Sequence, residues 1–312
     1  TLDSGDYTDA FELLAADQDA PFNAPLQTYQ AWAYIETGQP QQTIETLARV
    51  LSQEPNFLPA VLLNTLAALM VNNNSMALTS GAEGIAMAPG SAEAQLLESY
   101  AQQANFMLDA AYAAAAQAAM IAPDLAAATL QLTRLAIGRG EFDLALSHIA
   151  DVAPATLAKD TDLLTTQGFA LLAKGESKAA QRSFEQANQL NTPSADLALG
   201  QALIALRNGQ QKSALERIAS AVAMEPLEAS YMNYFGRILY ETKRFDKAIE
   251  VLERARQPDP NDPTPLYLLA IIKRDRNQAG EAIALLQIAE QLNDKRAVYL
   301  SRSVLDHDSA IK

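Results

Sequence analysis

This chain of 312 residues is predicted to be an all-α α-solenoid, a stack of helical hairpins, because three series of residues share one period. The first series consists of small side chains spaced 33 to 35 residues apart: Ala10, Thr43, Ala77, Ala111, Ala145, Ala180, Ala214, Ala248 and Ala282. The second series consists of prolines, each 12 residues C-terminal to a member of the first series: Pro55, Pro89, Pro123, Pro226 and Pro260. The third series consists of glycine or asparagine residues, each five residues N-terminal to a member of the first series: Gly5, Gly38, Asn72, Gly140, Gly175, Gly209 and Asn277. Self-similarity at such a period is typical of repeat architectures.

Each series has a physical role in a helical hairpin. A small side chain in the second helix allows the two helices to approach each other closely. Glycine in the turn supplies a positive φ at little cost. Proline cannot donate to a continuing helical ladder, so it ends the second helix. No single hairpin buries its apolar face alone, and stacking on its neighbours supplies the stability.

The three series divide residues 1–312 into a single array of eight full repeats, which begin near residues 24, 58, 92, 126, 161, 195, 229 and 263. A partial repeat precedes them at residues 1–23, with a second helix at Tyr7–Ala16, and another follows at residues 297–312. Because neither end has a polar capping helix, we expect further chain or a partner beyond each end. Pro154 falls about three residues early, which predicts a kink in the array at residues 151–160.

The repeat that begins near residue 58 carries two glycines in the interior of its second helix. Gly81 stands where a large residue is expected, and Gly84 stands where an alanine is expected. Each glycine costs roughly 1 kcal/mol relative to alanine inside a helix. We therefore expect the helices to pack unusually closely here or to leave a gap. We also expect Gly81→Ala to stabilise the repeat by about 0.4–1 kcal/mol if the methyl group fits, whereas a loss of stability would show that glycine is needed for close helix approach.

Charge is distributed unevenly along the chain, whose net charge is −14. Residues 1–123 contain thirteen acids and one base, Arg49, whereas residues 124–312 contain 24 acids and 22 bases. A nucleic-acid-binding protein carries a basic stripe, so the acidic first part argues against nucleic acid as a partner. Solubility is the simpler explanation of the acidity.

Residues that carry chemistry are scarce. Cysteine is absent, which excludes disulfides, thiolate zinc sites and thiol nucleophiles, and the only histidines, His148 and His307, are far apart. No glycine loop suits a phosphate, and no apolar run approaches the roughly 18 residues of a membrane helix. We therefore expect no enzyme activity, no metal or cofactor, and no direct insertion into a membrane.

The period and its residues resemble those of the tetratricopeptide repeat. The match is closest in Ala229–Pro260, where the following residues fall on positions typical of the family: Gly236, Leu239, Phe245, Ala248, Leu252, Ala255 and Pro260. The resemblance implies a right-handed superhelix of about eight repeats with a concave groove lined by first helices. It also implies a non-enzymatic scaffold that binds a protein or peptide segment in that groove.

Groove positions follow from the resemblance, residue by residue. The first four repeats contribute Trp32, Leu62, Leu66, Leu69, Leu96, Tyr100, Leu130 and Arg134. The last four contribute Phe169, Leu172, Leu199, Leu203, Asn233, Arg237, Tyr240, Tyr267 and Arg274. The groove so defined is apolar along most of its length and polar, aromatic and basic near its C-terminal end. We therefore expect a partner with apolar anchors and an acidic end, although neighbouring repeats could cover some of these positions.

The C-terminal third also resembles a narrower family. The residues concerned are Asp259–Pro265, Gln291–Asp294 and Arg296–Asp308. They are similar to the repeat section of long bacterial envelope proteins, in which the repeats lie between a FecR-like N-terminal domain and a C-terminal region that resembles an outer-membrane barrel. This resemblance implies a periplasmic or envelope-associated location and flanking domains in the full-length chain. Two alternatives stay open, a cytoplasmic assembly adaptor and a structural spacer whose groove binds nothing.

Overall fold

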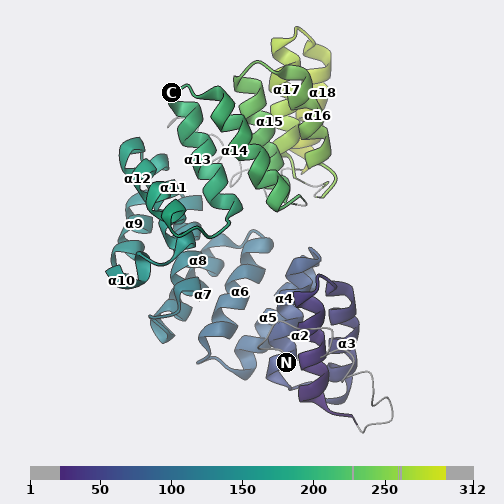
Figure 1. The fold of residues 1–312 in the computed structure, drawn as a ribbon. Helices are drawn as coiled ribbons and strands as arrows, with labels where there is room; N and C mark the ends of the chain where they lie inside the picture. The colour runs from purple at the N-terminus through teal and green to yellow at the C-terminus, as the bar shows by residue number, and fades with distance from the viewer. Residues whose placement is uncertain (1–21, 227, 259, 261, 293–312) are drawn as a thin grey trace. The chain divides into compact units, whose positions relative to one another are not determined.

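The structure is a computed structural model that describes residues 22–292, except residues 227, 259 and 261. Within these residues it contains seventeen helices and no strand (Figure 1), which confirms the predicted all-α α-solenoid. The predicted helix at Tyr7–Ala16 and the partial repeat at residues 297–312 lie outside the described residues.

The chain divides into two units, residues 1–132 and residues 133–312. The first unit consists of hairpins that stack in chain order, and each first helix also contacts the next first helix. Its helices are α2 (Ala24–Glu36), α3 (Pro40–Gln53), α4 (Leu58–Met70), α5 (Asn74–Met87), α6 (Ala92–Ala104) and α7 (Leu108–Ile121). The next helix, α8 (Ala126–Gly138), contains the boundary between the two units. The prediction that residues 1–312 form one array stays a prediction.

The second unit repeats the same pattern of hairpins and neighbour contacts. Its helices after α8 are α9 (Phe142–Ala150), α10 (Pro154–Leu157), α11 (Thr161–Ala173), α12 (Ser177–Gln189), α13 (Ala195–Arg207), α14 (Gln211–Met224), α15 (Ala229–Glu241), α16 (Phe245–Ala255), α17 (Thr264–Asp275) and α18 (Ala279–Leu292). The short α10 lies in the segment where Pro154 predicts a kink, and Pro154 occupies its first turn, where a missing amide is tolerated.

The helix boundaries follow the punctuation of the sequence. Successive first helices begin 34 or 35 residues apart. Four of the eight start behind an asparagine, serine or aspartate whose side chain accepts a hydrogen bond from a first-turn amide, and these caps are Asn23, Ser91, Asp160 and Ser194. Such caps satisfy amides that have no partner inside the helix. Prolines follow the second helices closely, as Pro55 does after α3 and Pro89 after α5.

The small residues of the first series lie where the two helices of a hairpin touch. Ala77, Ala111, Ala180 and Ala214 are fully buried. In the first described hairpin Thr43 takes this position, and its hydroxyl donates to the Ala31 carbonyl across the hairpin at 3.0 Å. The close approach inferred from the sequence is therefore present in both units.

Turn residues of the third series adopt the left-handed backbone conformation. Gly38, Gly140, Gly175 and Gly209 have φ between 72° and 89°, and Asn72 and Asn277 have φ of 55° and 62°. The sequence missed two turns in the same phase, because they are occupied by Phe106 and Lys243, with φ of 60° and 59°. A residue with a Cβ is strained in this conformation. The turns at Phe106 and Lys243 therefore keep the period of the fold, although neither residue is the glycine or asparagine expected there.

Glycines in first helices make room for a large side chain. A Cβ at Gly168 or at Gly200 would lie 2.4 Å from Cε1 of Phe184, so the ring occupies the space that both glycines leave. Gly236 stands in the same relation to Leu252. Phe184 and Leu252 are among the largest fully buried side chains of unit 2. The glycine in the first helix and the large residue in the second therefore form one packing element.

The glycines of α5 are compensated by a neighbouring helix. Gly81 and Gly84 are buried, and a Cβ at Gly81 would lie 2.4 Å from Oε2 of Glu98 on α6. Glu98, which is 5% exposed, thus fills the space beside Gly81. The gap that the sequence suggests is occupied, and the added methyl group of Gly81→Ala fits only if this carboxyl group moves.

Candidate functional site

The structure places the predicted groove residues at three levels of burial. Trp32, Leu66 and Arg274 are exposed. The half-buried ones are Leu62, Leu69, Tyr100, Leu130, Arg134, Phe169, Tyr240 and Tyr267. The buried ones are Leu96, Leu172, Leu199, Leu203, Asn233 and Arg237. Neighbouring repeats therefore cover many of these positions, particularly in unit 2, and the exposed apolar positions lie in unit 1.

Three predicted groove residues meet in an apolar hollow of unit 1. The hollow has a volume of about 430 Å³, and its wall comes from α2, the turn before α4, α4 itself and α6. The large apolar and aromatic side chains in its wall include Tyr29, Trp32, Phe57, Leu62, Leu66 and Leu97. Trp32 is 39% exposed to solvent, and Leu66 is 37% exposed.

Helical spacing explains why these residues share one face. Pro25, Tyr29 and Trp32 are three or four residues apart on α2, and Pro59, Leu62 and Leu66 have the same spacing on α4. Residues three and four apart lie on one side of a helix. Because first helices contact one another in sequence, α2 with α4 and α4 with α6, these faces join into one surface.

One carboxylate, Glu93, is part of the wall of this hollow, and a second, Glu36, contacts Trp32 of the wall. The Trp32 indole Nε1 donates to Glu36 Oε1 at 3.0 Å. The Ser91 hydroxyl donates to Glu93 Oε2 at 2.8 Å, and Glu93 is part of the wall. A hydrogen bond from its own backbone amide, and then the one from Ser91, lower the pKa of the Glu93 carboxyl. Glu93 therefore carries a full negative charge at neutral pH.

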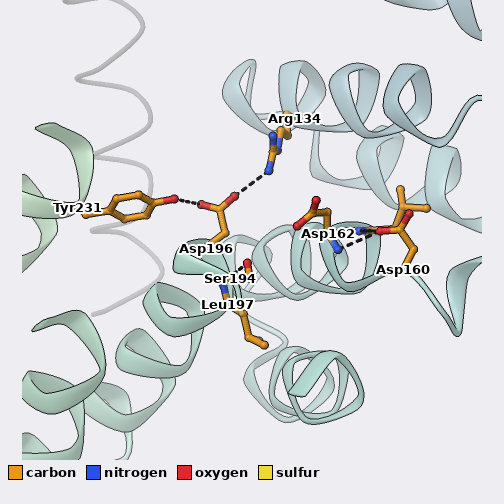
Figure 2. Close-up of polar contacts among 8 residues, drawn as sticks. Arg134, Asp160, Asp162, Ser194, Asp196, Leu197 and Tyr231 are labelled. Atoms are coloured by element: carbon orange, nitrogen blue, oxygen red, sulfur yellow. Dashed lines mark hydrogen bonds and ion pairs between the residues drawn. The ribbon is translucent and has the colours of Figure 1, made fainter. Parts of the chain in front are cut away.

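A second, polar cavity of about 660 Å³ lies in unit 2, and Figure 2 shows the contacts at its wall. Arg134 Nη2 of α8 lies 2.7 Å from Asp196 Oδ2 of α13. The Tyr231 hydroxyl of α15 donates to Asp196 Oδ1 at 2.9 Å. Asp196 thus connects three first helices of unit 2.

The helix ends at this cavity are capped by their own side chains (Figure 2). Asp160 accepts hydrogen bonds from the backbone amides of Asp162 at 3.0 Å and of Leu163 at 2.9 Å. Ser194 accepts one from the Leu197 amide at 3.2 Å. Two polar residues of the wall, Asp160 and Ser194, therefore act as the N-caps of α11 and α13.

Acids outnumber bases around the polar cavity. Its wall contains four carboxylates and two bases, Asp160, Asp162, Asp196 and Glu225 against Arg134 and Lys159. Burial, and then the charge of Asp196, raise the pKa of the Glu225 carboxyl. The same two causes, in the same order, raise the pKa of the Tyr231 hydroxyl. In the described part of the chain, no group of three His, Cys, Asp or Glu side chains is arranged to hold a metal ion.

The polar residues predicted for the C-terminal end of the groove contact acids of the same unit. Arg237 is 6% exposed, and its Nε donates to Glu241 Oε1 at 3.0 Å. Arg274 pairs with Asp275 at 2.9 Å, and Asp275 also accepts from the Tyr240 hydroxyl at 2.6 Å.

Asn233 belongs to the same set of contacts. Its side-chain amide donates to Asp262 Oδ2 at 2.9 Å, and Asp262 Oδ1 accepts from the Thr264 amide at 2.8 Å. Polar contacts therefore join α15 to the start and the end of α17. The sequence positions alone did not reveal that Asp262 would be a partner.

Comparison with known protein families matches tetratricopeptide repeats to residues 199–302. Two tetratricopeptide-repeat family models match residues 199–263 and residues 239–302. No curated protein matches this sequence. No described helix has the length and apolar character that crossing a membrane requires.

Solved structures share the fold at low sequence identity. The structure of the APC/C hetero-tetramer Cut9-Hcn1 matches with a TM-score of 0.62 and 14% identity, over 92% of this chain and 55% of that chain. This chain therefore spans little more than half of that protein.

Two further structures match with similar coverage of this chain. A human IFIT1 dimer with m7Gppp-AAAA matches with a TM-score of 0.59 and 14% identity, over 93% of this chain and 78% of that chain. A tetratricopeptide repeat protein from Parabacteroides merdae matches with a TM-score of 0.52 and 13% identity, over 91% and 98%. Residues 199–302 therefore match tetratricopeptide repeats, a class of repeat that generally serves protein–protein interaction and not catalysis, and the chain shares its fold with these solved structures.

Proposed function

We propose that this protein is a non-enzymatic scaffold that binds a peptide or protein segment through the apolar hollow of unit 1. The observation that carries the proposal is the exposure of Trp32 and Leu66 side by side in one concave surface. Apolar side chains that remain exposed together in a hollow usually mark a binding site. Covering them contributes about 25 cal/mol per Å² before the costs of association.

The experiment compares two substitutions in the full 312-residue chain. Leu66→Glu places a charge in the hollow, whereas Met120→Glu places the same charge on the second helix α7, where Met120 is 74% exposed and lies outside the hollow. Both variants should keep the helix content of the parent by circular dichroism. Peptides selected from a phage-displayed random library on the parent should lose binding to the Leu66→Glu variant and keep it with the Met120→Glu variant. Equal binding to all three proteins would exclude the hollow as the site.

Phe169 is a less suitable position for such a test. Its ring makes an edge-to-face contact with Phe184, at 5.5 Å between centroids, so a charge there would disturb the core of unit 2. A loss of binding on substitution of Phe169 would therefore not separate binding from folding.

We further propose a periplasmic or envelope-associated location, with flanking domains in the full-length protein. The support is the likeness of Asp259–Pro265 and Arg296–Asp308 to the repeat section of long bacterial envelope proteins that carry a FecR-like domain and a barrel-like region. Residues 296–308 lie outside the described residues. Cell fractionation of the full-length protein tests the location, and recovery in the cytoplasmic fraction would favour the assembly adaptor. If the library yields no peptide specific for the hollow, the structural spacer is the better explanation.

A further inference from the structure

We infer that the segment bound in the apolar hollow is basic, with its apolar anchors flanked by lysine or arginine. The inference rests on the proposed function and adds the charge of the partner. It follows from the carboxylates at the hollow and from the near absence of bases in the unit that contains it.

The first observation is local. Glu36 and Glu93 are exposed, Glu36 contacts the indole of Trp32, and Glu93 is part of the wall. Both stand beside apolar side chains that a partner would cover, so a cation next to the anchors would reach them. No lysine or arginine is among the residues that line the hollow.

Glu36 and Glu93 can accept further hydrogen bonds in addition to those they already accept within the protein. Glu93 lies in the first turn of α6, where the helix dipole favours a negative charge. Its Oε2 accepts from Ser91, and Oε1 of Glu36 accepts from Trp32. An ionised carboxylate has two oxygens and about four lone-pair sites, so each group can still accept a charge-assisted hydrogen bond from a partner.

The second observation concerns all the described residues of unit 1. Residues 22–132, all of which are described, contain eight acids and one base, a net charge of −7. The base, Arg49, lies on the second helix α3, where its Nη2 is 3.5 Å from Thr46 Oγ1. A field of one sign attracts partners of the opposite sign and raises their rate of association.

These observations change the expected charge of the partner. The acidic end expected from the sequence depends on Arg237 and Arg274, which lie in unit 2. Both arginines already form ion pairs with carboxylates of that unit, Glu241 and Asp275. The hollow of unit 1 has carboxylates beside its apolar wall, and a basic segment is its electrostatic complement.

The first experiment uses random peptides displayed on phage, selected on the full 312-residue chain and counter-selected on its Leu66→Glu variant. We expect the enriched peptides to combine large apolar residues with flanking lysine or arginine. Enrichment of neutral or acidic peptides would overturn this inference and leave the proposed function standing. Failure to enrich any peptide over the Leu66→Glu variant would overturn both.

The second experiment measures the affinity of one enriched peptide by the fluorescence of Trp32, the only tryptophan of the chain. Glu36→Gln and Glu93→Gln should each weaken binding about 1.5- to 5-fold, the range for a solvent-exposed ion pair. Glu45→Gln removes the same charge from α3, outside the hollow, and should leave the affinity within error.

Salt provides an independent measurement on the same peptide. The affinity of the parent should fall as ionic strength rises from about 0.01 M to about 1 M, because the Debye length shrinks from about 30 Å to about 3 Å. The double variant Glu36→Gln, Glu93→Gln should show a smaller dependence on salt. An affinity that changes neither with salt concentration nor with the two substitutions would overturn the inference.

Discussion

Single residues in this protein are selected by the space that a neighbouring helix leaves. Gly200 is required because the ring of Phe184 occupies the position of its Cβ, and Gly81 faces the carboxyl group of Glu98. The repeat pattern predicted a large residue at the position of Gly81, so it gave no reason for a glycine there. It could not predict Glu98, because a buried glutamate at a helix contact is rare and has no periodic counterpart in the other repeats.

The contact between Gly81 and Glu98 predicts a strong coupling between the two positions. In the parent chain Gly81→Ala should destabilise the protein, because the new Cβ collides with a buried carboxyl that must move. In a Glu98→Ala background that obstacle is gone, and the same change should stabilise the protein by about 0.4–1 kcal/mol. Denaturant unfolding of the four proteins measures the coupling. Additive effects of the two substitutions would contradict this packing.

Glu98 also predicts a dependence of stability on pH. Its Oε2 is buried without a hydrogen-bond partner, and burial raises the pKa of the carboxyl, although a hydrogen bond from Gln102 at 2.6 Å opposes the shift. The folded state therefore holds this proton more tightly than the unfolded state. The stability that the folded state gains from this proton is fully present below the unfolded pKa of Glu98 and is lost as pH rises through its folded pKa.

Glu98→Gln tests this pH dependence. Each unit by which the folded pKa exceeds the unfolded one corresponds to about 1.4 kcal/mol. The variant should gain stability relative to the parent as pH rises from the unfolded pKa of glutamate through the raised folded pKa, where the parent's Glu98 loses its proton. Glu83→Gln, at an exposed residue of α5, is the control and should follow the parent. A constant difference between parent and Glu98→Gln across this range would show that Glu98 titrates normally.

At the scale of helices and turns, the sequence was most informative where the backbone itself demands a residue type. The period, the helix ends and the buried small residues could all be read from glycine, proline and alanine. Two turns escaped because Phe106 and Lys243 adopt the positive φ that glycine or asparagine usually supplies. Tertiary packing of the flanking helices imposes the turn there, and this override has no signal in the local sequence.

The strained turn between α15 and α16 yields a prediction for Lys243. This residue is exposed and has a φ of 59°, a conformation that costs a residue with a Cβ about 1–2 kcal/mol. Lys243→Gly should therefore stabilise the protein, by about 0.5–1 kcal/mol after the entropy cost of glycine in the unfolded chain. The control is Lys247→Gly on the exposed side of α16, which should destabilise it by about 0.5–1 kcal/mol. Thermal unfolding monitored by circular dichroism compares the two.

At the scale of the molecule, the groove was only partly predictable. Trp32, Leu62 and Leu66, which the family positions assign to the groove, line one hollow. They also selected residues such as Leu199 and Asn233 that neighbouring helices bury. Burial depends on which side chain of the next repeat lies opposite, and pairs such as Tyr240 with Asp275 join residues 35 positions apart. Such pairs have no signature in a single sequence.

The division into units predicts that the chain does not unfold in a single step. Because helices contact mainly their neighbours along the chain, separate parts of a repeat array can unfold at different denaturant concentrations. Trp32 lies in unit 1 and is the only tryptophan, so selective excitation of tryptophan follows that unit, whereas far-ultraviolet circular dichroism follows helices of both units. The two unfolding curves of the parent should therefore not coincide.

Two core substitutions assign each transition to its unit. Gly200→Ala overpacks unit 2 against Phe184 and should cost about 1–3 kcal/mol, shifting the dichroism curve and leaving the Trp32 transition in place. Leu47→Ala empties a fully buried position of unit 1 and should cost about 2–5 kcal/mol, moving the Trp32 transition to lower denaturant. Coincident curves in the parent, together with a shift of the Trp32 transition by Gly200→Ala, would show that the two units unfold as one cooperative body. In that case the hollow of unit 1 would be sensitive to every core substitution in the chain, and binding variants would have to be compared at equal stability.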